Sequence, residues 1–425
     1  MNARPIRLVF CLAGLVFLDR GLGAATLRVP GEFASIQSAI AVAAQGDTIL
    51  VAAGTYRERL ILREGLILRS EGDDRRGAIG LWRAEATILD GRGGRGPGVT
   101  MAAGATLDGF TVTGVGSYDD KLWQHHHDTQ GREQSHEHIG QPGDAGIAVG
   151  TDCLVQHNIV HHIGSTGIAI QGSVAPLILG NVCHRNMGGG IGAMDGTTAR
   201  IEANVCFENF HAGIGCRAAS PLLKDNVCHG NIRGGIGISE GSSPSVTGNR
   251  CFSNRRAGIG IRTGADTRPV VEDNSCTNNA MAGIGVEEGA RPRLVRNRVH
   301  GNALPAIAVT GGAEAWIEGN DLARDGGTPP LLVVLGDSRA VITGNRLRGG
   351  GVAGIMVKGR AEIRNNHFVG NGPTAKPPAN QAVWAQSGAE VHCSGNRIEG
   401  WKQVLTQAQD AKVTAVDNAW VGYSR

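Results

Sequence analysis

The sequence predicts an all-β fold: a single-stranded right-handed parallel β-helix of about 23 residues per turn, with three short strands in each turn. The first observation behind this is an asparagine that recurs mostly in steps of 20 to 25 residues, with one longer step before the eleventh member. The recurring residues are Asn158, Asn181, Asn204, Asn226, Asn249, Asn274, Asn297, Asn320, Asn345, Asn366, Asn396 and Asn418. A period of this length indicates stacked repeats, each of which buries its apolar face only against its neighbours.

The second observation is that apolar residues flank each asparagine at fixed distances. Two positions after the asparagine stand Cys183, Cys206, Cys228, Cys251 and Cys276. Later in the same turns, after a glycine, stand Ile191, Ile214, Ile236, Ile259 and Ile284. The apolar runs are short, alternate with a period of two and are bounded by glycine, proline or asparagine, which predicts strands and not helices.

The asparagines and cysteines of these columns are interpreted as structural. Stacked asparagines can bond to one another and to the turns of adjacent repeats. Free cysteine is among the most buried residue types, so the cysteine column is expected to fill a narrow core. A thiolate column for a soft metal such as copper is the alternative, and it would require thiol ionisation inside an apolar core.

The two ends of the chain carry their own signals. Residues 1–25 combine Arg4 and Arg7, an apolar run and small residues before a cleavage site, which is the layout of a signal peptide. We therefore expect a mature domain of residues 26–425 in the periplasm or outside the cell. Residues 33–44 have apolar residues at helical spacing and are expected to cap the core. At the far end, Trp420 falls in the core column and is expected to close the last turn.

Composition excludes two classes of partner. A net charge of +3 over 425 residues and an aromatic content of 4% offer neither the positive field nor the stacking platform of a nucleic-acid-binding protein. After the first 25 residues, no apolar run approaches the ~18 residues of a membrane span. The oligomeric state is left open.

The first turn resembles a known superfamily. Residues 29–33 (VPGEF), 35–40 (SIQSAI), 46–51 (GDTILV) and 54–58 (GTYRE) are similar to the first turn of the pectate-lyase-like superfamily of parallel β-helix proteins. That group includes secreted carbohydrate-active proteins and periplasmic copper-maturation proteins of the NosD type. The resemblance implies the fold, whereas the paired aspartates of polygalacturonases and the Arg-Pro-any-any-Arg pattern of pectate lyases are missing.

A histidine-rich insertion, residues 115–143, interrupts the repeats, as does a proline-rich loop at 372–380. Loops this long usually bind or cover something, and we expect the insertion to fold over the N-terminal part of the glycine-rich face. Imidazoles suit transition metals. The candidate ligands for a divalent ion (copper, zinc or calcium) are His125, His127, His136 and His138, with His161 and His162 from the next turn. A solvated polar loop is the alternative.

Each Gly-Ile-Gly segment predicts a glycine that points out of the solenoid, because the isoleucine points in. We call Gly192, Gly215, Gly237, Gly260 and Gly285 the glycine stripe. One side of the stripe is expected to carry Arg217, Arg262 and Glu287, with Asp195 and Glu240 just beyond, and the other side His211, Arg233 and Arg256. A long, flat floor between charged rims suits an extended polar polymer.

Three functions remain open. The first is binding of an extended polysaccharide, acidic or neutral, with or without lyase or epimerase chemistry, in which Arg217 and Arg262 hold a carboxylate and His211 acts as the base. The second is a non-enzymatic metal-binding or maturation protein that uses the insertion. The third is a structural or partner-binding solenoid.

Overall fold

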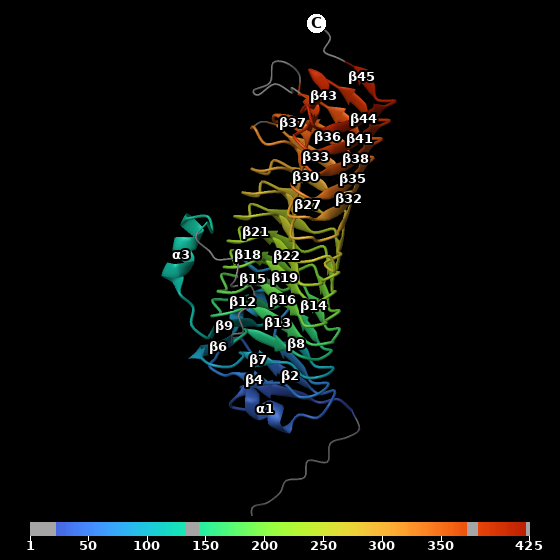
Figure 1. The fold of residues 1–425 in the computed structure, drawn as a ribbon. Helices are drawn as coiled ribbons and strands as arrows, with labels where there is room; N and C mark the ends of the chain where they lie inside the picture. The colour runs from blue at the N-terminus through green and yellow to red at the C-terminus, as the bar shows by residue number, and fades with distance from the viewer. Residues whose placement is uncertain (1–22, 133–143, 326, 372–380, 422–425) are drawn as a thin grey trace, which may run out of the picture.

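The protein was analysed as a computed structural model that describes residues 23–132, 144–325, 327–371 and 381–421. In these ranges the chain winds into one long solenoid of three parallel sheets (Figure 1). Sheet A has 16 strands, from β1 (Thr26–Val29) to β44 (Lys412–Val416). Sheet B has 15 strands, from β3 (Gly54–Tyr56) to β45 (Ala419–Val421). Sheet C has 14 strands, from β4 (Leu60–Ile61) to β43 (Gln403–Gln407). The predicted all-β parallel β-helix is confirmed.

Successive turns pair in strict register in sheet C. Its central strands are β16 (Ile191–Met194), β19 (Ile214–Arg217), β22 (Ile236–Ser239), β25 (Ile259–Ile261) and β28 (Ile284–Val286). Ile191 pairs with Ile214, which pairs with Ile236. Since side chains alternate along a strand, this register stacks the isoleucines inside the core, where they are fully buried, and turns the glycines out.

The recurring asparagines form a continuous hydrogen-bonded ladder, as predicted. The backbone N–H and side-chain Nδ2 of Asn181 both donate to Oδ1 of Asn204, at 2.9 and 3.0 Å. A second ladder of buried asparagines was not predicted. It contains Asn186, Asn209, Asn231, Asn254, Asn279 and Asn302. Both ladders satisfy buried polar groups at the corners between sheets, which an apolar residue there could not do.

The cysteine column lies in sheet B and in the core. Its strands are β15 (Val182–His184), β18 (Val205–Phe207), β21 (Val227–His229), β24 (Arg250–Phe252) and β27 (Ser275–Thr277). Cys206 pairs with Cys183 on one side and with Cys228 on the other. All five cysteines of the column are free and fully buried, which fits the core-filling interpretation.

The two ends of the solenoid differ. Helix α1 (Ile36–Val42) lies within the predicted capping segment, packs on the first strands and buries Ile36 and Ile40 (Figure 1). At the other end the prediction for Trp420 was wrong: it lies in register with Ile398 but is 53% exposed, because no further turn stacks on it in the described residues. The tryptophan that this end buries is Trp401.

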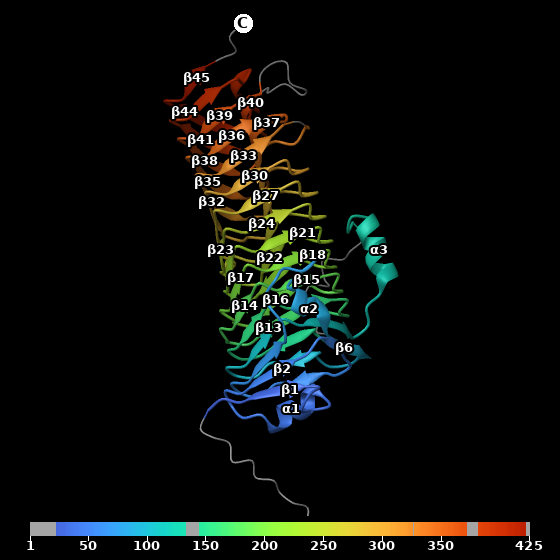
Figure 2. The ribbon, with the colours of Figure 1, turned by 180° about the vertical axis from the view of Figure 1, so that it is seen from behind.

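The histidine-rich insertion is not a plain loop. It contains helix α3 (Asp120–Asp128), which stands beside the solenoid with its axis along it (Figures 1 and 2). A shorter helix, α2 (Trp82–Ala86), packs on the outside of sheet B, where Ala84 contacts Ile159 and Val182. Residues 133–143 and the proline-rich loop at 372–380 lie outside the described residues, as do residues 1–22 of the predicted signal peptide. Neither α1, α2 nor α3, nor any other described helix, has the length and apolarity of a membrane crossing.

Candidate functional site

The glycine stripe leaves an open floor on sheet C. Among the described residues, a Cβ atom added at Gly215 or Gly260 would meet no other atom within 4 Å, and at Gly237 the nearest would be Cβ of Ala212, at 3.7 Å. None of the five glycines has a positive φ. Neither backbone conformation nor packing therefore requires glycine at these positions, and their smallness leaves room above the sheet.

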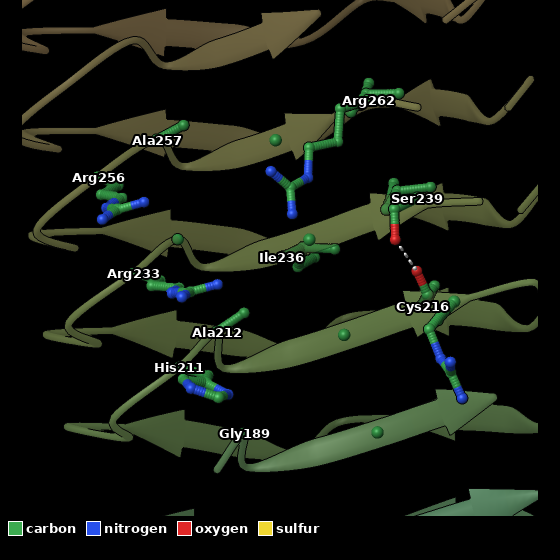
Figure 3. Close-up of a pocket in the computed structure, with 18 of the residues that line it drawn as sticks. Gly189, His211, Ala212, Cys216, Arg233, Ile236, Ser239, Arg256, Ala257 and Arg262 are labelled. Atoms are coloured by element: carbon green, nitrogen blue, oxygen red, sulfur yellow. Dashed lines mark hydrogen bonds between the residues drawn. The ribbon is translucent and has the colours of Figure 1, made fainter. Parts of the chain in front are cut away.

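One rim of this floor is a column of residues at equivalent positions in successive turns. The N–H of Arg233 donates to the carbonyl of His211 at 3.3 Å, and the N–H of Arg256 donates to the carbonyl of Arg233 at 3.1 Å. Figure 3 shows the three side chains one above another on the same side of the strands. Met281 continues the column in the next turn, where its N–H donates to the carbonyl of Arg256.

The opposite rim lies at the ends of the same strands. Met194, Arg217 and Ser239 pair in register at the ends of β16, β19 and β22, and Arg262 follows β25 (Figure 3). The stripe and the two rims enclose a groove of about 240 Å³. Its charged lining residues are Arg217, Arg233, Arg256, Arg262 and Glu287, and the imidazole of His211 lines it as well.

Positive charge predominates in the groove lining that the structure describes. Among those residues, four arginines and one carboxylate, that of Glu287, line the groove. Arg233 is only 5% exposed, and burial, followed by the positive charges of Arg256 and Arg262, lowers its pKa to about 10. Burial and then Arg262 also lower the pKa of Arg256, against the opposing effect of Glu287. An anion placed among these guanidinium groups would relieve their mutual repulsion and accept charge-assisted hydrogen bonds.

Two predicted rim residues lie outside the groove lining. Oδ1 of Asp195 is 3.3 Å from Nη2 of Arg217, and both side chains are partly solvated, so this ion pair contributes little to stability. Glu240 follows β22 as an exposed residue with a φ of 54°. The structure thus brings together His211, the four arginines, Glu287 and the stripe, and leaves Asp195 and Glu240 beside them.

The described half of the insertion, residues 115–132, lies beside the groove; residues 133–143 lie outside the described residues, so the expected cover over the N-terminal part of the floor stays a prediction. Trp123 of α3 is 3% exposed and packs against Phe210 and Ile232. Its Nε1 donates to the carbonyl of Glu208 at 2.8 Å. These partners belong to the turns between sheets B and C, so α3 runs along the outside of the His211 rim. The sequence holds a signal for this helix in Asp119, whose side chain caps its first turn by accepting from Leu122 N–H at 2.9 Å.

The predicted metal ligands do not converge within the described residues. His125 and His127 are two positions apart on α3 and point to different sides, because neighbours on a helix are three or four residues apart. The Nδ1 atoms of His161 and His162 lie 2.6 Å from each other, and the ring of Tyr118 packs against His162. No group of three or more His, Cys, Asp or Glu in the described ranges is arranged to hold a metal ion. His136 and His138 lie outside those ranges, so the metal site stays a prediction.

The sequence profile of the family described as "right handed beta helix region" matches residues 137–266, 215–322 and 265–419. No curated protein sequence matches the chain.

Three solved structures illustrate what the chain is similar to. The A-module of the mannuronan C-5 epimerase AlgE6 of Azotobacter vinelandii aligns at 17% identity and a TM-score of 0.45, over 91% of this chain and 93% of that one. The periplasmic alginate epimerase AlgG aligns at 13% and 0.43, over 88% and 77%. The catalytic unit of a GH87 alpha-1,3-glucanase from Streptomyces thermodiastaticus aligns at 11% and 0.43, over 95% and 70%.

The assignment rests on the sequence profile, whose matches together cover well over half of the chain. The described residues wind as three parallel sheets, one short strand of each per turn. The chain therefore belongs to the right-handed β-helix family.

Proposed function

We propose that the protein is exported and binds an extended acidic polysaccharide along the groove on sheet C. The observation that carries the proposal is the glycine stripe itself, which no described residue covers at Gly215 and Gly260 although nothing in the backbone requires glycine there. Adjacent turns lie ~4.8 Å apart, so five turns make a floor much longer than a single sugar. A flat floor of this kind suits the apolar face of a sugar ring, and polar rims suit its substituents.

The charges on the rims favour a carboxylated polymer. Arginine presents a planar fork of donors that matches a carboxylate with two parallel hydrogen bonds. Arg233 and Arg256 stand one turn apart on one rim, with Arg262 on the other (Figure 3). Carboxylates spaced along a chain could meet these residues in turn.

An extended peptide fits this surface less well. Peptides that bind sheets usually add a strand to an exposed edge. Here β22 is hydrogen bonded to β19 on one side and to β25 on the other. The groove therefore offers side chains and an outer face, and no free backbone edge in its centre.

His211 is the candidate base if the bound polymer is also modified. In lyase or epimerase chemistry a cation neutralises the uronate carboxylate, and a positioned base takes the neighbouring proton. His211 lines the same rim as Arg233, one turn away, and it is half-buried. The proposal assigns proton abstraction to His211 and carboxylate neutralisation to the arginines, including Arg217 and Arg262 on the opposite rim.

The test is a calorimetric titration with polygalacturonate, alginate and a neutral glucan. We expect the two carboxylated polymers to bind, with an affinity that falls as salt rises. Arg233→Ala and Arg256→Ala should each weaken binding about tenfold, as expected for a lost charged hydrogen bond. The matched control is Arg291→Ala, which removes an exposed arginine paired with Glu314 outside the groove. Equal binding of the neutral glucan, or none of any polymer, would contradict the proposal.

The chemical step needs a separate readout. Incubation with each uronan, followed by ultraviolet absorbance for an unsaturated product and by NMR for a change at C5, distinguishes cleavage from epimerisation. Either signal should disappear in His211→Ala while binding persists. Binding without either signal would leave a polysaccharide-binding solenoid and remove the role given to His211.

A further inference from the structure

The docking of α3 against the solenoid is centred on Trp123. The Arg185 guanidinium lies over its ring at 4.0 Å, and the ring of His127 stacks on it at 4.9 Å. The indole N–H donates to the carbonyl of Glu208, and the ring edge packs on Phe210. Aromatic and cation contacts on a desolvated ring fix its position much more firmly than a surface contact would.

The C-terminal end of α3 reaches the arginine rim directly. Nη2 of Arg255 bonds to Nε2 of His127 at 2.8 Å. The next residue, Arg256, donates from Nη2 to the carbonyl of Gly131 at 2.8 Å. Because Arg255 and Arg256 belong to one turn between β24 and β25, the helix holds that turn by two adjacent side chains.

Gly131 lies where the described part of the insertion meets the rim. It is buried, with a φ of 65°, and a Cβ atom there would lie 2.6 Å from the carbonyl oxygen of Ile232. Ile232 directly precedes Arg233, so the same contact borders both arginines of the rim. Only glycine can bring the Gly131 carbonyl this close to Arg256 without displacing backbone.

We propose that Trp123 and Gly131 are positioning residues of the groove: α3 and the turn after it orient the Arg256 guanidinium so that it receives an anionic group of the ligand. An arginine side chain loses considerable rotamer freedom when it binds. A hydrogen bond to the fixed carbonyl of Gly131 restricts that freedom in advance. The inference rests on the proposed function, because it concerns the same groove.

Gly131→Val in the full chain tests the close contact, with Gly336→Val as its matched control. Gly336 has a φ of 64°, and a Cβ atom there would meet nothing within 4 Å, so the control carries the same backbone strain without the displacement. We expect Gly131→Val to weaken polygalacturonate binding about tenfold, the size of one lost charged hydrogen bond, with the thermal midpoint of the solenoid close to that of Gly336→Val. Trp123→Ala should behave like Gly131→Val, and Trp123→Phe should restore most of the affinity.

A double-mutant cycle separates positioning from general damage. If Gly131 acts through Arg256, Gly131→Val should cost little further affinity when Arg256→Ala is already present. Additive losses in the cycle, or unchanged affinity in Gly131→Val, would overturn the inference. Failure of the wild type to bind any carboxylated polymer would overturn the proposed function instead, so the two failures are distinguishable.

Discussion

Ring-bearing side chains on the outer face of sheet B form a stacked column, and two of its histidines are held neutral there. His161 stacks on His184, which stacks on Phe207 at an interplanar angle of 3°. The column continues through His229 and Phe252. Burial, followed by the neighbouring histidines, lowers the pKa of His161 to about 4 and that of His184 to about 3. Neutral rings stack without repulsion, which protonation would introduce.

These depressed pKa values predict a loss of stability in acid. An unfolded histidine titrates near ~6.5, so the unfolded chain binds protons more readily than the folded one below that pH. The contribution of the two neutral histidines to folding stability is therefore complete above about pH 6.5. It is lost as the pH falls towards 4 for His161 and 3 for His184. We expect the free energy of unfolding, measured by denaturant titration, to fall by on the order of a few kcal/mol over this range.

His184→Phe should reduce this acid sensitivity. Phe207 and Phe252 already occupy the same column, so phenylalanine preserves the stacking and removes the titrating group. His392→Phe supplies the control, because it makes the same substitution at an exposed position on sheet A, outside the stacked column. An identical acid loss in His184→Phe and the wild type would show that other groups govern it.

The cysteine column predicts slow thiol chemistry. Burial raises the pKa of the Cys206 thiol well above its usual value, and thiols react as thiolates. A thiol reagent added to the native protein should modify none of the five column cysteines rapidly, and all five should react after denaturant is added. Rapid native labelling of the column would contradict its place in the core.

At the scale of the element, the strands could be predicted because they recur in every repeat. The insertion could not, because it occurs once. Period-two alternation in Gly-Ile-Gly predicted which side chains point in, and Ile236 and Gly237 lie accordingly. Helix α3 has no homologous copy with which to align, and its single strong local signal is the cap at Asp119. Its neighbours across the chain, such as Phe210, depend on tertiary packing that the local sequence does not encode. The second asparagine ladder runs through only part of the solenoid, which made its period easy to miss.

Substitutions on the two faces of one strand should differ in their effect on thermal stability. Gly237→Trp places a ring on the open floor, so the thermal midpoint should change little. Ile236→Asp buries a charge where the isoleucine is fully enclosed, which should cost several kcal/mol of stability. Differential scanning calorimetry of both variants measures this. Comparable losses would mean that the backbone needs glycine at position 237 and that the floor is not available to a ligand.

At the scale of the whole molecule, architecture and site are encoded in different ways. The architecture was predictable because the turns repeat one residue pattern, in which asparagine occupies a corner between sheets and isoleucine or cysteine fills the core. The candidate site lies where the turns differ: equivalent rim positions hold His211, Arg233, Arg256 and Met281. A repeat pattern identifies such positions but does not say which of their side chains act together. The contacts that α3 and the turn after it make with the rim come from outside the repeat.

A groove that crosses many turns should have a measurable footprint. Tryptophan can be placed singly at each glycine of the stripe, Gly192, Gly215, Gly237, Gly260 and Gly285. We expect the largest losses of polygalacturonate affinity at Gly237 and Gly260, which lie in the turns that supply Arg233, Arg256 and Arg262, and smaller losses towards the ends. Longer oligomers should bind more tightly until the floor is filled, and the end substitutions should weaken only these longer ligands. Equal losses at all five positions for a short oligomer would indicate a general effect on sheet C, since a short ligand contacts only the turns beneath it.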